Sequence, residues 1–115
     1  MLWIGRMFKK RLKKSMAFKI VITQKAHIDI LEGVEWYDKQ STDIGKRFYQ
    51  TIQKKFKTLR QNPFFQVRYE DVRCLPLGKY PYLIHFVLDE ERELIIVIGV
   101  ICTYLNPETW EERIE

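Results

Sequence analysis

Few side chains in this 115-residue sequence have the types and spacing needed for catalysis. Cys74 and Cys102 lie in strand-like segments and are expected to be buried, reduced thiols, although neighbouring strands could bring them close. His27 falls on an expected helix and His85 on an expected strand, without a third ligand at metal-binding spacing. The sequence has no phosphate-binding glycine loop, HExxH or CxxC motif. It therefore predicts no cofactor and no metal site.

Basic and aromatic side chains in the second half of the chain are the remaining candidates. They could neutralise phosphate charge, or form an aromatic platform for bases or for a protein surface. They could equally be structural, with tyrosines covering sheet edges and an arginine paired with an acid. These candidates are Arg68, Arg73, Lys79, Tyr80, Tyr82, Tyr104 and Trp110.

A strand and two helices are expected to precede these residues. Residues 18–23 are short and β-branched, which is typical of a strand. Thr23 can cap a helix that continues to about Tyr37. A second helix is expected over residues 44–62, because Pro63 forbids helical geometry at the residue before it. The expected buried side chains are Ala26, His27, Ile30, Leu31, Val34 and Tyr37 on the first helix, and Ile44, Phe48, Ile52, Phe56 and Leu59 on the second.

The apolar faces of these helices need a partner, and the rest of the chain predicts a sheet. Residues 67–74 alternate between apolar and charged types, with a bulge or turn near residues 70–71. A turn at residues 76–78 is followed by a strand over 82–88. Beyond a charged hairpin tip, residues 94–103 are apolar on both faces, which is typical of a central strand.

Charge is distributed unevenly along the chain. The formal net charge is +5, but six of the 20 basic residues lie in the first fifteen positions, which contain no acid. Residues 16–115 are left with 14 basic and 15 acidic groups, a net charge of −1. Two interpretations of residues 1–15 are open. They are either a basic amphipathic extension of the protein, or an upstream stretch that is read in frame although the true start is Met16. Residues 16–115 are expected to form one domain.

The hydrophobic and charged contents, 46% and 30%, are those of an ordinary globular protein. No apolar run approaches the roughly 20 residues of a membrane-spanning helix. We therefore expect a cytoplasmic protein without a membrane partner.

Eight short groups of residues connect the chain to a known family through their order and spacing. They are Ala26, Asp29-Ile30, Trp36-Tyr37, Gly45-Phe48, Asn62-Pro63, Val72-Arg73, Tyr80-Pro81-Tyr82 and Asn106-Pro107-Trp110-Arg113. Across residues 18–113 they resemble the RelE/ParE superfamily of toxins from bacterial type II toxin–antitoxin modules, often labelled plasmid stabilisation proteins. The resemblance implies an α+β fold of order β-α-α-β-β-β with a short C-terminal helical turn. In it, a helical hairpin packs on a small twisted antiparallel sheet whose concave side is the active face.

Members of this superfamily follow two mechanisms. RelE-like toxins cut mRNA on the ribosome, and ParE-like toxins poison DNA gyrase; a small antitoxin silences both. The cutters use basic side chains, including an arginine at a position that corresponds here to Tyr82. Close relatives also have a histidine and an arginine where this chain has Cys102 and Leu105. Because cleavage needs a base, an acid or strong charge stabilisation, the chain departs from the cutting branch.

The resemblance therefore indicates a ParE-like toxin that inhibits growth by binding a protein such as DNA gyrase and forms oligomers through its antitoxin. The expected target-binding residues are Arg73, Tyr82, Tyr104, Trp110 and Arg113. The expected antitoxin contact is a groove beside the helical hairpin, near Trp36, Phe48 and Ile52. One alternative is a ribosome-dependent endoribonuclease using Arg73, Lys79 and Tyr82 on mRNA. The other is a decayed toxin that still binds its antitoxin.

Overall fold

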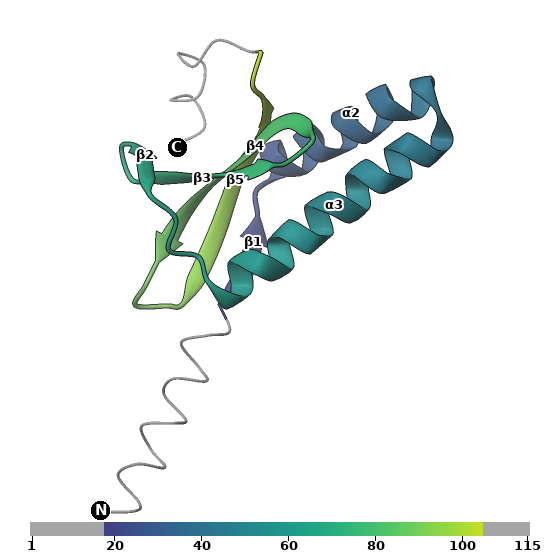
Figure 1. Cartoon of the computed structure of the whole chain (residues 1–115). Coiled ribbons are helices and arrows are strands. Elements are labelled where there is room, and N and C mark those ends of the chain that lie inside the picture. Colours follow the sequence, from purple (N-terminus) through teal and green to yellow (C-terminus); the bar gives the residue numbers. More distant parts are fainter. Residues whose placement is uncertain (1–17, 105–115) are drawn as a thin grey trace, which may run out of the picture.

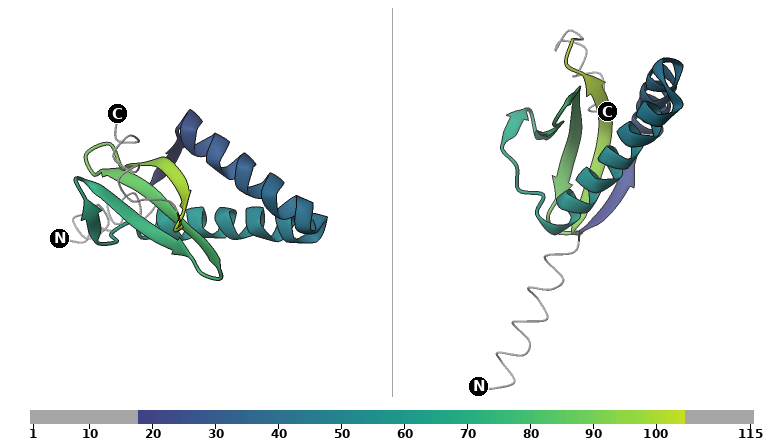
Figure 2. Two further views of the ribbon diagram at one scale, coloured as in Figure 1. Left: turned by 90° about the horizontal axis from the view of Figure 1, so that it is seen from above. Right: turned by 45° about the vertical axis from the view of Figure 1, so that its right-hand side comes forward.

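Two helices lie side by side against one face of a twisted five-stranded sheet (Figures 1 and 2). The computed structural model describes residues 18–104. The elements are β1 (Lys19–Ile22), α2 (Gln24–Gln40), α3 (Thr42–Gln61), β2 (Val67–Tyr69), β3 (Val72–Leu77), β4 (Tyr80–Asp89) and β5 (Leu94–Cys102). The expected α+β fold with a helical hairpin on a sheet is confirmed.

Local signals set the ends of the hairpin. The Thr23 hydroxyl oxygen accepts a hydrogen bond from the Ala26 backbone N–H at 3.2 Å, so this residue caps α2 as predicted. Asn62, which precedes Pro63, is extended and ends α3. The expected buried stripe of α2 is wrong at His27 and Leu31, which are both exposed.

The sheet is mixed, with strand order β1-β5-β4-β3-β2. β1 runs parallel to β5, and Lys19 lies opposite Leu94, so the sheet is not wholly antiparallel. The irregularity near residues 70–71 is a turn with Glu70 at positive φ, which separates β2 from β3. As a result, four strands follow the helices instead of the expected three. β5 lies between β1 and β4, which confirms its predicted central place.

The turn after β3 lies two residues later than the sequence predicts. β3 continues through Pro76 to Leu77, and the turn consists of Gly78 and Lys79, with Gly78 at φ +78°. A glycine at positive φ in the first position of a two-residue loop is the pattern of a type II′ hairpin turn. Pro76 is tolerated in this strand because β2 pairs only with the opposite end of β3.

The core lies between the hairpin and the sheet, and Phe48 is at its centre. Its fully buried ring lies 4.9 Å from the ring of Tyr37, 5.1 Å from that of Tyr80 and 5.0 Å from that of Tyr82, measured between centroids. Ile52 on the next turn of α3 is also fully buried. This aromatic cluster joins both helices to the start of β4.

The predicted C-terminal helical turn, with Trp110 and Arg113, lies outside the described residues, as does the N-terminal extension. Within residues 18–104, neither helix combines the length and apolar character needed to cross a membrane.

Candidate functional site

Two adjoining hollows lie between α2 and the ends of β4 and β5. The first has a volume of about 230 Å³, and the second about 270 Å³. The two hollows share Trp36, Tyr82 and Cys102, and together we call them the α2–β5 groove. Its described lining residues are Asp29, Glu32, Gly33, Trp36, Tyr37, Pro81, Tyr82, Val100, Ile101, Cys102 and Tyr104.

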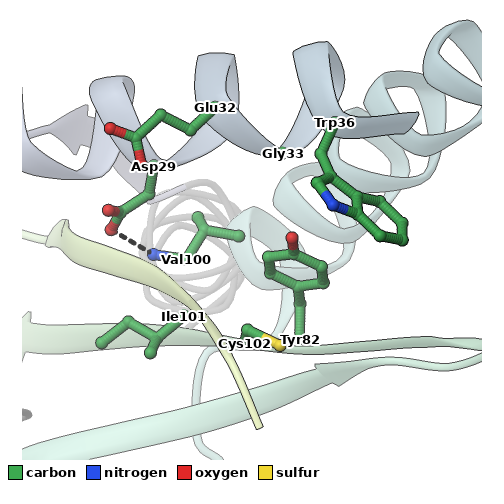
Figure 3. Close-up of a pocket in the computed structure, with 8 residues that line it drawn as sticks. All are labelled: Asp29, Glu32, Gly33, Trp36, Tyr82, Val100, Ile101 and Cys102. Atoms are coloured by element: carbon green, nitrogen blue, oxygen red, sulfur yellow. Dashed lines mark hydrogen bonds between the residues drawn. The ribbon is translucent and has the colours of Figure 1, made fainter. Parts of the chain in front are cut away.

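Helical and strand periodicity bring these residues together. Asp29, Gly33 and Trp36 recur at intervals of four and three residues, so they line one side of α2. On the sheet, Tyr82 of β4 lies directly opposite Cys102 of β5. Figure 3 shows the Tyr82 hydroxyl pointing from the sheet toward α2, beside Trp36. The groove thus has one helical wall and one wall formed by strand ends.

Gly33 lies where α2 packs closely against Phe48 and Tyr82. A Cβ atom at this position would lie 2.7 Å from the Phe48 ring and 3.6 Å from the Tyr82 hydroxyl oxygen. A contact of 2.7 Å is closer than packed carbon atoms allow, so only glycine fits here without moving Phe48. Gly33 therefore sets how deeply the Tyr82 ring lies under α2.

An acidic residue ties α2 to the edge of β5. The Asp29 carboxylate accepts a hydrogen bond from the Val100 backbone N–H at 3.0 Å (Figure 3). β1 ends at Ile22, opposite Val97, so Val100 lies beyond the last strand partner on this edge. Asp29 satisfies a backbone donor there that β1 does not reach. Together with Glu32, which is exposed, it makes this end of the groove acidic.

The Tyr82 hydroxyl is a hydrogen-bond donor, not a base. Burial raises the pKa of Tyr82 to about 12, and Cys102, Tyr37, Asp29 and Glu32 act in the same direction. Burial also raises the pKa of Tyr37, which lines the same groove. Both hydroxyls therefore keep their protons at neutral pH. The groove can bind through aromatic surface and hydrogen bonds, and neither Tyr37 nor Tyr82 acts in it as a phenolate at neutral pH.

The structure brings together some of the predicted site residues and separates others. Tyr82 and Tyr104, predicted to bind a target, lie in one groove with Trp36, predicted to bind an antitoxin. Trp36 is 56% exposed and Tyr104 is 85% exposed. Phe48 and Ile52, by contrast, are fully buried in the core, so in this structure neither side chain is exposed beside Trp36. Both residues belong to the apolar stripe of α3, and this stripe packs against the sheet.

The three residues of the ribonuclease alternative do not converge. Arg73 lies opposite Phe86, four residues along β4 from Tyr82, a separation of roughly 13 Å. Its guanidinium donates a hydrogen bond to the Phe65 carbonyl at 3.3 Å. The Lys79 ammonium lies 5.5 Å from the centre of the Tyr80 ring. Arg73 and Lys79 are not among the described residues that line the groove.

The acidic residues of the groove are the ones that sequence reasoning missed. Asp29 belongs to one of the groups that carry the family resemblance, but it was given no role. Glu32 and Gly33 had no signal beyond their helical spacing from Asp29 and Trp36. That spacing could have identified the wall once α2 was known to lie beside β5.

The two cysteines lie in different environments, because Cys74 is buried and Cys102 is half-buried in the groove. β4 separates their strands, so the possibility that they lie close is not realised. Burial raises the pKa of the Cys74 thiol to about 11, and Arg68 offsets only part of this effect.

Alkylation of the native protein with iodoacetamide at pH 8 should therefore modify Cys102 first. The raised pKa alone gives Cys74 about a hundredfold less thiolate than a thiol of pKa 9. Peptide mass spectrometry over time measures the two rates, and denatured protein, in which both should react, is the control. Equal rates in the native protein would contradict the assigned burial.

Comparisons with known proteins agree with this architecture. Neither the family models nor the curated proteins include a match to the sequence. A chain of a solved structure, "Chromosomal ParDE TA system from P. aeruginosa", superposes with a TM-score of 0.65 and 20% sequence identity. The match covers 76% of this chain and 97% of that chain. The resemblance indicated by the sequence is thus confirmed at the level of architecture, and the chain has a ParE-like fold.

Proposed function

We propose that this protein is the toxin of a type II toxin–antitoxin module, acts by binding a partner protein such as DNA gyrase, and is neutralised by a cognate antitoxin. The solved structure with the same fold is described as a ParDE toxin–antitoxin system. Because a fold alone does not determine function, the proposal depends on the site. Its main support is the α2–β5 groove, which is aromatic and acidic.

Such a groove suits a protein segment better than RNA. Trp36 and Tyr104 offer exposed aromatic surface of the kind that dominates protein interfaces. The charged residues among its described lining are Asp29 and Glu32, and their carboxylates repel phosphate. The groove therefore favours a partner segment with apolar and basic side chains.

The presence of both sets of predicted binding residues in one groove suggests how the antitoxin neutralises the toxin. Residues predicted for the target and for the antitoxin line the same hollow. An antitoxin segment lying across Trp36 would cover Tyr82 and Tyr104. Under this proposal, inhibition is direct occlusion of the target-binding surface.

Pulse labelling tests the proposal. The full chain is induced in a bacterium without the antitoxin, and incorporation of thymidine and leucine is followed over the first minutes. We expect DNA synthesis to fail first, after which a supercoiling assay with purified gyrase identifies the target. Earlier failure of protein synthesis would favour the ribonuclease. Undisturbed growth at matched protein levels would favour the decayed toxin.

A further inference from the structure

The outer face of α3 has a charge pattern that the groove does not explain. Residues 44–69 contain no aspartate or glutamate but include seven lysines and arginines. Within this stretch, Lys46, Gln50, Lys54, Lys57 and Gln61 are all exposed. We call these five residues the α3 basic face.

Helical geometry places these five residues on one stripe. Their spacings are four, four, three and four residues, so they follow the side of α3 opposite to Phe48 and Ile52. From Lys46 to Gln61 the stripe is roughly 22 Å long at 1.5 Å per residue. It is therefore long enough to contact several successive phosphates of a nucleic acid backbone.

The lysines of this face have no acidic partner in the structure. Among residues 18–104, the ion pairs are Arg47 with Asp43 and Arg92 with Asp89. The acids of the hairpin are concentrated on α2 instead, at positions 29, 32, 35 and 38. The net charge of −1 for residues 16–115 thus conceals two oppositely charged helices.

Phe18, the first described residue, lies at the C-terminal end of α3. The Phe18 backbone N–H donates a hydrogen bond to the Arg60 carbonyl at 3.0 Å, and Arg60 lies three residues after Lys57 in α3. In the sequence, Phe18 follows shortly after residues 1–15, which include six cations and no acid.

We propose that the α3 basic face binds the phosphate backbone of duplex nucleic acid. Lysine and glutamine side chains commonly contact phosphate and sugar oxygens, and such contacts carry no sequence information. The five residues include no aromatic ring, whereas single-strand binders rely on rings for base stacking. This surface lies outside the α2–β5 groove and does not depend on the function proposed for that groove.

Fluorescence anisotropy tests the proposal with the full chain, made by cell-free synthesis. The probes are fluorescein-labelled 20-base-pair DNA and RNA duplexes, titrated at salt concentrations from 50 to 200 mM. Lys54→Gln with Lys57→Gln should weaken binding by about tenfold or more and reduce the slope of log K against log salt by roughly 2. Comparison of the two probes shows whether DNA or RNA is preferred.

Lys25→Gln with Lys39→Gln is the matched control, because it removes the same charge from exposed positions of α2. The control should change affinity by less than about twofold, and residues 1–15 are the same in both variants. Equal losses in the two variants, or no loss in either, would overturn the proposal. Binding of the α3 basic face to phosphatidylserine vesicles but to neither duplex would also overturn the proposal, because the face would then be a membrane contact. Circular dichroism confirms that each variant is folded.

Discussion

Replacing Phe48 with alanine should lower the free energy of unfolding by about 3–5 kcal/mol. The ring is fully buried and packs against three tyrosine rings from α2 and β4, so its removal leaves a cavity under both helices. Much of the stability of a domain of this size would be lost, since such domains have only about 5–15 kcal/mol in total. Urea denaturation followed by circular dichroism measures the change.

Tyr49→Ala is the control for this variant, because Tyr49 is the next residue along α3 and is 45% exposed. It should change the free energy of unfolding by no more than about 0.5 kcal/mol. A cost below about 1 kcal/mol for Phe48→Ala would contradict the central position of the ring in the core.

If the chain is a toxin as proposed, replacing Trp36 with alanine should abolish growth inhibition at expression levels at which the original chain arrests cells. A central aromatic residue of an interface typically contributes about 2–4 kcal/mol, which corresponds to a loss of roughly 30- to 1,000-fold in affinity. Because the side chain is 56% exposed, stability should change little. Colony counts over a range of inducer concentrations measure the effect, with protein levels matched by immunoblot.

Leu31→Ala provides the control on the same helix. Leu31 is 57% exposed and is not among the described residues of the α2–β5 groove. It should leave growth inhibition unchanged. If Trp36→Ala remained fully toxic, the groove would not be the target-binding surface.

Neutralisation gives this variant a second readout. If target and antitoxin use the same groove, Trp36→Ala should also weaken capture by the antitoxin. Loss of only one of the two interactions would mean that the surfaces are separate, and occlusion could not then explain neutralisation.

Elements marked by local signals were predictable from the sequence. The Thr23 hydroxyl oxygen and the proline at position 63 act on their immediate neighbours, so the ends of the hairpin could be placed closely. The apolar run over residues 94–102 likewise identified the inner strand β5. Burial on both faces is visible in a sequence because it removes the usual polar alternation.

Pairing between distant segments was not predictable in the same way. No local feature of residues 19–22 specifies that they lie parallel to β5, because every residue type except proline offers the same backbone N–H and C=O groups. The turn after β3 was misplaced because a Pro-Leu-Gly sequence favours a turn. Pro76 instead lies within β3, where it pairs with Leu83 of β4, and β2 does not extend along the other edge of β3 at this point.

The candidate site was predictable only in part for the same reason. Tyr82, Tyr104 and Trp36 were identified, but their meeting in one groove depends on α2 lying beside β5. The apolar stripe of α3 predicted burial for Phe48 and Ile52, and in this structure neither side chain is exposed beside Trp36. Exposure, which separates a core residue from a binding residue, is a tertiary property.

The pairing of β1 with β5 has a consequence for the order of events during synthesis. Lys19 lies opposite Leu94, so β1 must wait for β5 to be synthesised before the two strands can pair. Contacts so far apart in sequence form slowly, because a long loop must first be closed. The α2–β5 groove likewise is formed by residues that are far apart in the sequence, from Asp29 to Tyr104. A ribosome-bound chain therefore lacks the complete groove until Tyr104 has been synthesised, so a partner that recognises the whole groove will not bind shorter nascent chains.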